Sequence, residues 1–293
     1  MIRQVIEQAV SEATGLPFLV KHQFSLAGGS INAAFRIAGE HGCNYFLKLS
    51  DEQGLAMLEA EADGLRELSA AGTIRIPEPV CTGTAYARAF LVTEYINMAG
   101  EKAGSSRLLG EQLAGLHRTT AFRFGWWRDN TIGSTPQCNS QSDDWVDFYR
   151  SRRLQFQMDL ACRNGFSGSL QSKGERLLAD LDQFFDSYKP EPSLLHGDLW
   201  GGNHGFDEHG KPVIFDPAVY FGDREADLAM SELFGGFSSD FYAAYNEAWP
   251  LDSGYRVRKT LYNLYHILNH ANLFGGGYAA QAESMIDRLL AEV

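Results

Sequence analysis

The spacing of apolar residues divides the chain into two regions, one with mixed strand and helix patterns and one with mainly helical patterns. Apolar residues recur at helical intervals over residues 2–10, and Gly15 follows as a stop, which predicts an N-terminal helix. A second helix is predicted over about residues 53–71. Short apolar and alternating runs predict strands near residues 22–27, 33–38, 44–49, 79–84 and 89–94.

From about residue 97 onward the pattern is mainly helical, and strands are expected only near residues 193–195 and 213–216. We therefore predict an α+β protein with two lobes. Residues 1–96 would form a small β-rich lobe, and residues 97–293 would form a larger, mainly helical lobe.

The most informative segment is a loop motif followed by a short apolar strand. The loop is His196-Gly-Asp-Leu-Trp-Gly-Gly-Asn203, and the strand Val213-Ile-Phe-Asp216 ends in a second aspartate. This order suits phosphoryl transfer from a nucleotide. Asp198 would accept the proton of an incoming hydroxyl, while Asn203 and Asp216 would hold Mg²⁺, a hard ion that prefers oxygen ligands. The ordinary alternative is a surface turn, because Gly, Asp and Asn are common turn residues.

The motif and the two regions together predict a protein-kinase-like, two-lobe fold, because a small β-rich lobe followed by a larger helical lobe is what a kinase needs. Residues 1–96 would bind the nucleotide, and residues 97–293 would serve catalysis and substrate binding. The nucleotide is expected in the cleft between the lobes, a common place for ligand sites.

The first region contains two candidate phosphate-binding features. The turn Gly28-Gly29-Ser30 would bring backbone N–H groups close to phosphate oxygens. Lys48 is a charge within the otherwise apolar strand Tyr45-Phe-Leu-Lys-Leu49. Each feature alone has a simpler explanation, because such a turn is common in hairpins and a strand lysine usually faces solvent.

Helical geometry selects an acid to pair with this lysine. One residue advances about 100° around a helix, so Glu61 falls within the apolar arc that contains Leu58, Ala62 and Leu65. Glu59 falls to the side of that arc. Because a buried carboxylate without a cation is costly, we predict that Glu61 pairs with Lys48.

The segment 89–97 is an apolar strand that runs into the expected junction between the lobes. Backbone groups of Glu94 and Ile96 would face the adenine edge, with apolar neighbours against the ring. A plain core strand explains the same apolar residues, and only its position in the series favours the nucleotide.

Composition and charge restrict the class of protein. The 293 residues are 44% hydrophobic, which excludes a disordered chain, and four scattered cysteines support neither a zinc site nor a disulfide framework. No apolar run approaches a membrane span and the N-terminus is no signal peptide, so we expect a cytoplasmic protein. The net charge of −12 argues against nucleic acid and anionic membranes as partners.

The residues after Asp216 restrict the substrate. Pro217 follows it, and the segment 224–230 already has a helical pattern, so a long activation loop that docks peptides has no room. A small or protruding hydroxyl-bearing substrate is therefore expected. Aromatic residues are dense in the second region, where most are expected to belong to the core and some would hold a sugar face or a cationic amine.

Several segments carry distinctive motifs, namely Leu195-His-Gly-Asp-Leu-Trp-Gly-Gly-Asn203, Phe215-Asp-Pro-Ala218, 220–230, Leu233-Phe-Gly-Gly-Phe237, 126–133, 143–149 and Asn269-His-Ala-Asn-Leu-Phe-Gly275. Taken together, these motifs resemble those of the fructosamine/ketosamine 3-kinase family, over essentially the whole chain. More distantly the chain is similar to aminoglycoside phosphotransferases and choline kinases, which share the His-Gly-Asp-x-x-x-x-Asn pattern and a helical segment ending at His117. That histidine is expected to be a packed helix residue rather than a catalyst.

The resemblance implies an ATP- and Mg²⁺-dependent kinase that phosphorylates the 3-hydroxyl of ribulosamine or fructosamine adducts, a deglycation repair activity. The ketoamine would be a small molecule or protein-bound, and the number of subunits is left open, with a monomer as one option. The resemblance also implies that Lys48 contacts the α- and β-phosphates and that Asp227 braces the catalytic loop through its backbone N–H groups. Trp200 would border the substrate, and His270 and Asn130 are further substrate-contact candidates.

Three other interpretations stay open at this point. A kinase for an aminoglycoside, choline or a free sugar would use the same catalytic residues, and only Trp200 and the segment 126–133 argue against it. A non-catalytic nucleotide-binding module is disfavoured by the complete set of candidate catalytic residues. A protein kinase is disfavoured by the missing activation loop.

Overall fold

The computed structural model describes residues 2–26 and 32–293, and the chain divides into two compact units. The first unit comprises Met1–Ser105 and Gly202–Pro217, and the second comprises Ser106–Gly201 and Ala218–Val293. This division differs from a single boundary near residue 96, because the segment Gly202–Pro217 returns to the first unit. The functions assigned above to the two lobes remain predictions.

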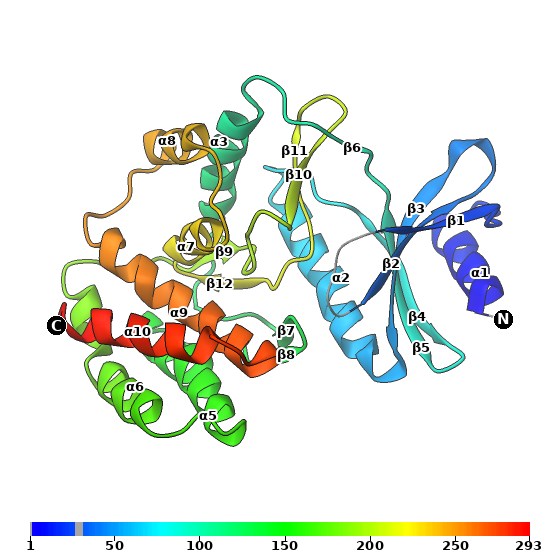
Figure 1. The fold of residues 1–293 in the computed structure, drawn as a ribbon. Helices are drawn as coiled ribbons and strands as arrows, with labels where there is room; N and C mark the ends of the chain where they lie inside the picture. The colour runs from blue at the N-terminus through cyan, green and yellow to red at the C-terminus, as the bar shows by residue number, and fades with distance from the viewer. Residues whose placement is uncertain (1, 27–31) are drawn as a thin grey trace. The chain divides into compact units, whose positions relative to one another are not determined.

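The first unit is built on a five-stranded antiparallel sheet in the order β1-β2-β3-β5-β4 (Figure 1). Every helix and strand predicted for this part of the chain is present, with ends that differ by a few residues. The elements are α1 (Ile2–Thr14), β1 (His22–Leu26), β2 (Ala33–Ala38), β3 (Asn44–Asp51), α2 (Leu55–Ala70), β4 (Pro79–Ala85) and β5 (Arg88–Glu94), with 3₁₀ turns at Glu40–Gly42 and Glu52–Gly54.

Both faces of this sheet are covered, since α1 and α2 lie on opposite sides of it (Figure 1). Phe90 and Val92 of β5 belong to the cluster that contains α1, whereas Ala89 and Leu91 belong to the cluster that contains α2. Successive strand residues point to opposite faces, so β5 is apolar at every one of these positions. This explains why the segment has a continuous apolar run rather than an alternating pattern.

A second, three-stranded sheet completes the first unit, in the order β11-β10-β6. Its strands are β6 (Met98–Ala99), β10 (His204–Asp207) and β11 (Pro212–Ile214). The prediction of a strand over 213–216 is wrong at its end, because β11 stops at Ile214 and Asp216 lies beyond it. The hairpin formed by β10 and β11 pairs with β6, which is why Gly202–Pro217 belongs to this unit.

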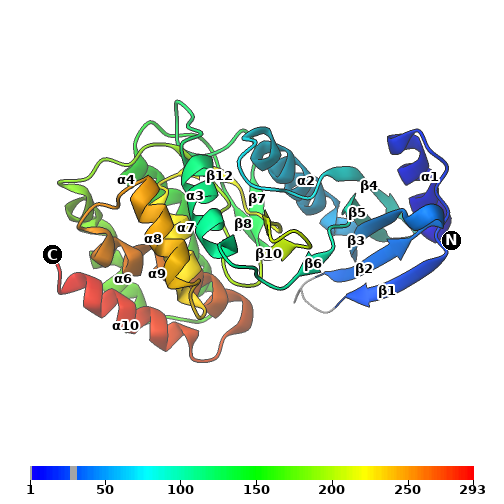
Figure 2. The ribbon, with the colours of Figure 1, turned by 90° about the horizontal axis from the view of Figure 1, so that it is seen from above.

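The second unit is mainly helical, as predicted (Figure 2). However, it contains the strands β7 (Asn130–Ile132), β8 (Thr135–Gln137), β9 (Ser193–Leu195) and β12 (Tyr220–Gly222), and only β9 was expected. The others have three residues each, too few to give an alternating pattern. The helices are α3 (Ser105–His117), α4 (Trp145–Phe148), a π-helical turn (Tyr149–Leu154), α5 (Gln155–Arg163), α6 (Ser169–Ala179), a 3₁₀ turn (Leu181–Phe185), α7 (Glu225–Leu233), α8 (Ser239–Ala248), α9 (Tyr255–Phe274) and α10 (Tyr278–Leu290).

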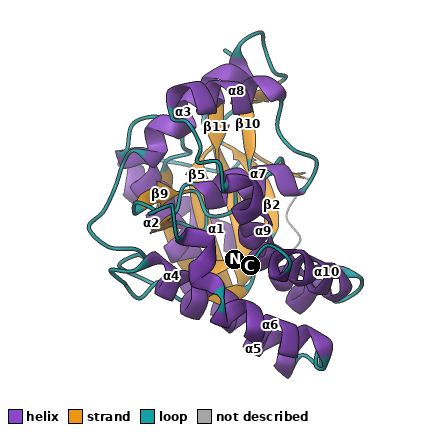
Figure 3. Cartoon of the chain, turned by 90° about the vertical axis from the view of Figure 1, so that its left-hand side faces the viewer, coloured by secondary structure: helices purple, strands orange, loops and turns teal. Residues whose placement is uncertain are grey.

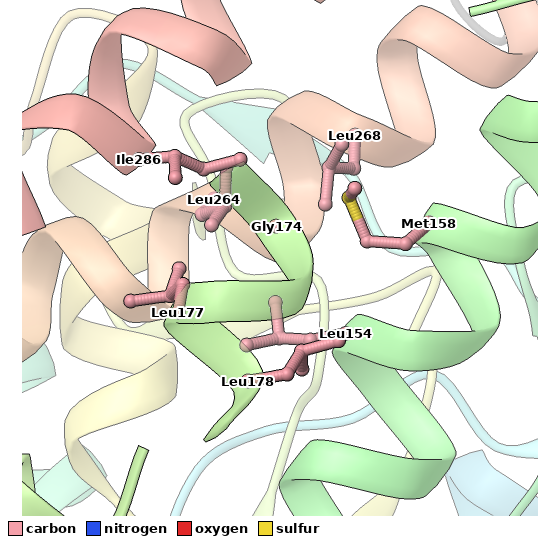
Figure 4. Close-up of a pocket in the computed structure, with 8 residues that line it drawn as sticks. All are labelled: Leu154, Met158, Gly174, Leu177, Leu178, Leu264, Leu268 and Ile286. Atoms are coloured by element: carbon pink, nitrogen blue, oxygen red, sulfur yellow. The ribbon is translucent and has the colours of Figure 1, made fainter. Parts of the chain in front are cut away.

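Helix α9 is the centre of the second unit, and it is packed by α5, α7 and α10. Figure 3 shows these helices from the side on which α5, α6 and α10 lie close together. A small apolar void of about 10 Å³ lies among them, lined by leucines, Ile286, Met158 and Gly174 (Figure 4). A void of this size and polarity holds no ligand.

Across residues 2–26 and 32–293, no helix combines the length and the apolar character needed to cross a membrane.

Candidate active site

In the first unit, the structure places a buried lysine between two carboxylates. Lys48 on β3 has a side chain that is 9% exposed, and its Nζ lies 2.6 Å from Oε1 of Glu61 on α2. The same Nζ lies 2.6 Å from Oδ1 of Asp216. The predicted pairing of Lys48 with Glu61 is therefore confirmed, and Asp216 joins it.

The charges of this triad are strongly coupled. Burial opposes the charged form of Lys48, but the carboxylates of Asp216 and Glu61 outweigh it and raise the pKa of the ammonium. Burial also raises the pKa of Glu61 to about 7, with Asp216 adding to the shift and Lys48 opposing it. One cation thus serves two carboxylates, and a second cation beside Asp216 would relieve the remaining negative charge.

Asp216 has a backbone conformation that is uncommon for a residue other than glycine. Its φ is 57°, in the left-handed region, where a residue other than glycine is strained by about 1–3 kcal/mol. Asn203, which is buried, donates from Nδ2 to the Asp216 carbonyl at 3.4 Å, and Phe215 N–H donates to the Asn203 carbonyl at 3.0 Å. The two predicted metal ligands are therefore held together across the base of the β10–β11 hairpin.

The donor set fits Mg²⁺ on a polyphosphate. Asp216 offers a carboxylate and Asn203 an amide oxygen, both hard ligands. Within the described ranges, no group of three or more His, Cys, Asp or Glu side chains is arranged to hold a metal ion. An ion at this pair would need further oxygens from phosphate and water, which is how Mg²⁺ usually binds beside nucleotides.

The remaining nucleotide contacts predicted for the first unit are less defined. Gly28, Gly29 and Ser30 lie outside the described residues. The backbone N–H of Glu94 donates to the Glu78 carbonyl at 2.8 Å, and Ile96 is buried. Their proposed contacts with adenine stay a prediction.

Sequence reasoning missed Arg75, which joins the end of β5 to the β10–β11 hairpin. Its guanidinium lies 2.7 Å from Glu94 and 2.8 Å from Asp207, and its carbonyl accepts the N–H of Ile214. Asp207 also accepts the backbone N–H groups of two residues in the hairpin turn, and these bonds outweigh burial and hold its pKa low. A single arginine in a loop, 132 residues from its partner, leaves no signal in the sequence.

In the second unit, the loop after β9 carries Asp198 and is fixed by Asp227 of α7. Asp227 accepts the N–H of His196 at 2.7 Å and of Gly197 at 2.8 Å, as the resemblance implied. Its Oδ2 also lies 3.2 Å from Nε2 of His117, which is fully buried, so His117 is a packed residue as predicted. Burial opposes the charge of Asp227, but the bond and charge of His117, with the loop N–H groups, outweigh it and lower the pKa.

Gly197 is a position of this loop where contact with the neighbouring backbone requires glycine. Its φ is +82°, and a Cβ there would lie 2.0 Å from the carbonyl oxygen of Ala218. Beyond it, Asp198 is half-buried, and its carbonyl accepts the N–H of Trp200 at 3.2 Å. The indole of Trp200 is 38% exposed. The loop therefore presents the candidate base and the candidate substrate-bordering ring on one short, braced segment.

The two further substrate candidates differ in their surroundings. Asn130 is buried, donates to the Val219 carbonyl and accepts from Gln137 and Asn139. Because its amide is used within the fold, we leave Asn130 out of the proposed substrate site. His270 on α9 is half-buried, and its ring centroid lies 4.9 Å from that of Phe234.

Comparisons with known proteins agree across nearly the whole chain. A family model described as fructosamine kinase matches residues 2–292. A "Probable ketoamine kinase" of Synechocystis is 44% identical over 289 residues, covering 98% of this chain and 96% of the relative. A chloroplastic protein-ribulosamine 3-kinase of Arabidopsis thaliana is 42% identical over 273 residues, covering 91% and 82%.

Solved structures give the same grouping. The crystal structure of a candidate fructosamine-3-kinase from Haemophilus somnus 129PT aligns with a TM-score of 0.89 at 30% identity, covering 97% of this chain and 96% of that one. Aminoglycoside phosphotransferase APH(4)-Ia, in a ternary complex with ADP and hygromycin B, aligns with a TM-score of 0.62 at 15% identity, over 98% of both chains. This second likeness supports the protein-kinase-like fold alone.

Proposed function

The chain belongs to the fructosamine kinase family, and we propose that it transfers the γ-phosphoryl group of ATP to the 3-hydroxyl of ribulosamine or fructosamine adducts. The observation that carries this proposal is the buried Lys48 shared by Glu61 and Asp216, with Asn203 beside it in the same compact unit. The names of the relatives, ketoamine kinase and protein-ribulosamine 3-kinase, support the substrate class.

The first unit would bind the nucleotide. Lys48 would contact the α- and β-phosphates, held by Glu61, and the turn at Gly28, Gly29 and Ser30 would supply backbone N–H groups. Glu94 and Ile96 would face adenine. Mg²⁺ held by Asn203 and Asp216 would neutralise charge on the phosphates.

The second unit would supply the base. As the 3-hydroxyl oxygen bonds to the γ-phosphorus, the bond from that phosphorus to the bridging oxygen breaks and ADP leaves with the electron pair. Asp198 takes the hydroxyl proton late in this step. The brace from Asp227 fixes the loop, so positioning supplies a large part of the rate. Trp200 would border the sugar and amine portion of the substrate, with His270 as a second contact.

We propose further that the enzyme works in the cytoplasm on small or protein-bound ketoamines, as a deglycation repair activity. The ketoamine nitrogen is usually protonated, so the net charge of −12 would not repel it.

The test is ATP consumption with Mg²⁺ against ribulose-lysine, fructose-lysine, ribose, choline and kanamycin, with Asp198→Asn as the blank. Turnover confined to the two ketoamines supports the proposal and ranks the sugars. Turnover on choline or kanamycin alone would refute the substrate and keep the kinase mechanism. Silence on every compound, with ATP still bound, would indicate a nucleotide-binding module instead.

A further inference from the structure

A continuous row of aromatic rings begins at the loop that carries Asp198. The ring centroids of Trp200 and Phe234 are 6.2 Å apart, and those of Phe234 and His270 are 4.9 Å apart. From His270 the row divides to Phe274 at 5.5 Å and to Tyr278 at 5.2 Å. All five rings, which we call the aromatic row, belong to the second unit.

The row is more open than a packing cluster. Trp200, Phe234 and Phe274 are 38%, 36% and 55% exposed, while His270 and Tyr278 are half-buried. Single exposed apolar residues are ordinary, but exposed apolar groups in mutual contact are typical of a ligand surface. The rings come from four separate segments, namely the Asp198 loop, the end of α7, the end of α9 and the start of α10.

The chemistry of the row restricts its occupant. Four of its five side chains are Trp, Phe or Tyr rings and the fifth is the imidazole of His270, so the row offers mainly apolar faces and ring edges. Its first member is two residues from Asp198, and the carbonyl of Asp198 accepts the Trp200 N–H. A substrate whose hydroxyl meets Asp198 would therefore place its remaining part along the rings.

We propose that the aromatic row binds the substituent on the amine of the ketoamine, and that it selects adducts with an aromatic or long apolar substituent over those with a small one. This inference rests on the proposed function, in which the sugar part meets Asp198. We expect the row to bind the substituent equally in the ground state and the transition state, so this binding lowers KM and leaves kcat largely unchanged.

The experiment compares two adducts with the same ribulosyl group, one on phenethylamine and one on methylamine. kcat and KM are measured for both with wild type, Phe234→Ala and Phe274→Ala. The matched control is Phe122→Ala, since Phe122 lies in the same unit, is fully exposed and does not belong to the row.

Wild type should have the lower KM for the phenethylamine adduct, and each row variant should reduce this preference about three- to tenfold, the usual size of one aromatic contact. Phe122→Ala should keep the wild-type preference. An equal preference in wild type and both row variants would overturn the proposal, as would the same reduction in Phe122→Ala.

A binding measurement separates the failure of the proposed kinase function from the failure of the proposal that the aromatic row binds the substituent. If wild type phosphorylates neither adduct, equilibrium binding of the phenethylamine adduct is measured by calorimetry with the same variants. Binding weakened only by Phe234→Ala and Phe274→Ala keeps the row as a ligand surface without the kinase reaction. No binding to wild type refutes the row as well.

Discussion

Acidification should destabilise the second unit through His266, a buried ring near the middle of α9. This side chain belongs to a residue that is 5% exposed, and burial lowers the pKa of its ring to about 3, with the charges of His270 and Arg153 acting in the same direction. In the unfolded chain the ring titrates near 6.5. The folded state therefore excludes a proton that the unfolded state accepts.

The direction and size of the change in the free energy of unfolding with pH follow from proton linkage. The stability contributed by the neutral ring is fully present above pH 6.5 and is lost as the pH falls from there toward 3. At pH 5.5 about nine in ten unfolded rings are protonated while the folded ring is not, which costs about 1.4 kcal/mol relative to pH 7.5. Glu225 acts in the opposite direction, because burial raises its pKa to about 7 and its contribution is lost as pH rises.

Because other groups also titrate in this range, the effect of His266 is measured as the difference in pH dependence of unfolding between wild type and His266→Phe. Urea unfolding is followed by tryptophan fluorescence at pH 7.5 and 5.5 for wild type and His266→Phe. All five tryptophans, Trp126, Trp127, Trp145, Trp200 and Trp249, lie in the second unit, so the signal reports on the unit that contains His266. Wild type should lose about 1.4 kcal/mol more than the variant between the two pH values.

A histidine in the other unit provides the control for the effect of His266 on the free energy of unfolding. His209→Asn removes a mainly exposed histidine of the first unit and should leave the wild-type pH difference unchanged. If His266→Phe retains the whole pH difference of wild type, within about 0.5 kcal/mol, the buried ring is not its source.

Three further predictions concern the site itself. Asp198→Asn should lower kcat by about 10²–10⁴ while calorimetry finds nucleotide affinity near wild type; full turnover would remove Asp198 from its role. Lys48→Met should weaken ATP binding at least tenfold in a titration, because Glu61 and Asp216 lose their shared cation and repel the phosphates. Asp227→Asn should destabilise the second unit by about 2–4 kcal/mol in urea unfolding, since one carboxylate serves two loop N–H groups and His117; an unchanged midpoint would contradict the brace.

The parts of the candidate site that depend on the sequence pattern of a single helix or strand could be predicted from the sequence. The helical position of Glu61 among apolar residues was enough to choose it over Glu59, because burial of a carboxylate demands a cation and Lys48 was the strand cation available. The sheet of the first unit was predictable for the same reason, since its strands are long enough to carry a pattern.

Features that arise from pairing between distant segments were not predictable. The strands β6 and β10 have two and four residues, and they pair across more than a hundred positions. Arg75 has no local partner that would mark it, yet it holds the β10–β11 hairpin to the end of β5. The left-handed φ of Asp216 was also missed, because an apolar run before an aspartate favours a strand that continues.

The loop motif from His196 to Asn203 is divided between the two compact units, and its sequence does not reveal this division. Asp198 belongs to the second unit and Asn203 to the first, although only four residues separate them. The loop of the proposed base, Asp198, is fixed by Asp227 on α7, whereas the proposed metal ligands are fixed by the β10–β11 hairpin and its pairing with β6. A substitution that loosens α7 should therefore lower kcat with little change in nucleotide affinity, and one that loosens the hairpin should lower nucleotide affinity first. The two halves of this short motif therefore depend on the packing of different elements. Measuring kcat and nucleotide affinity on the same variants separates the contribution of α7 from that of the hairpin.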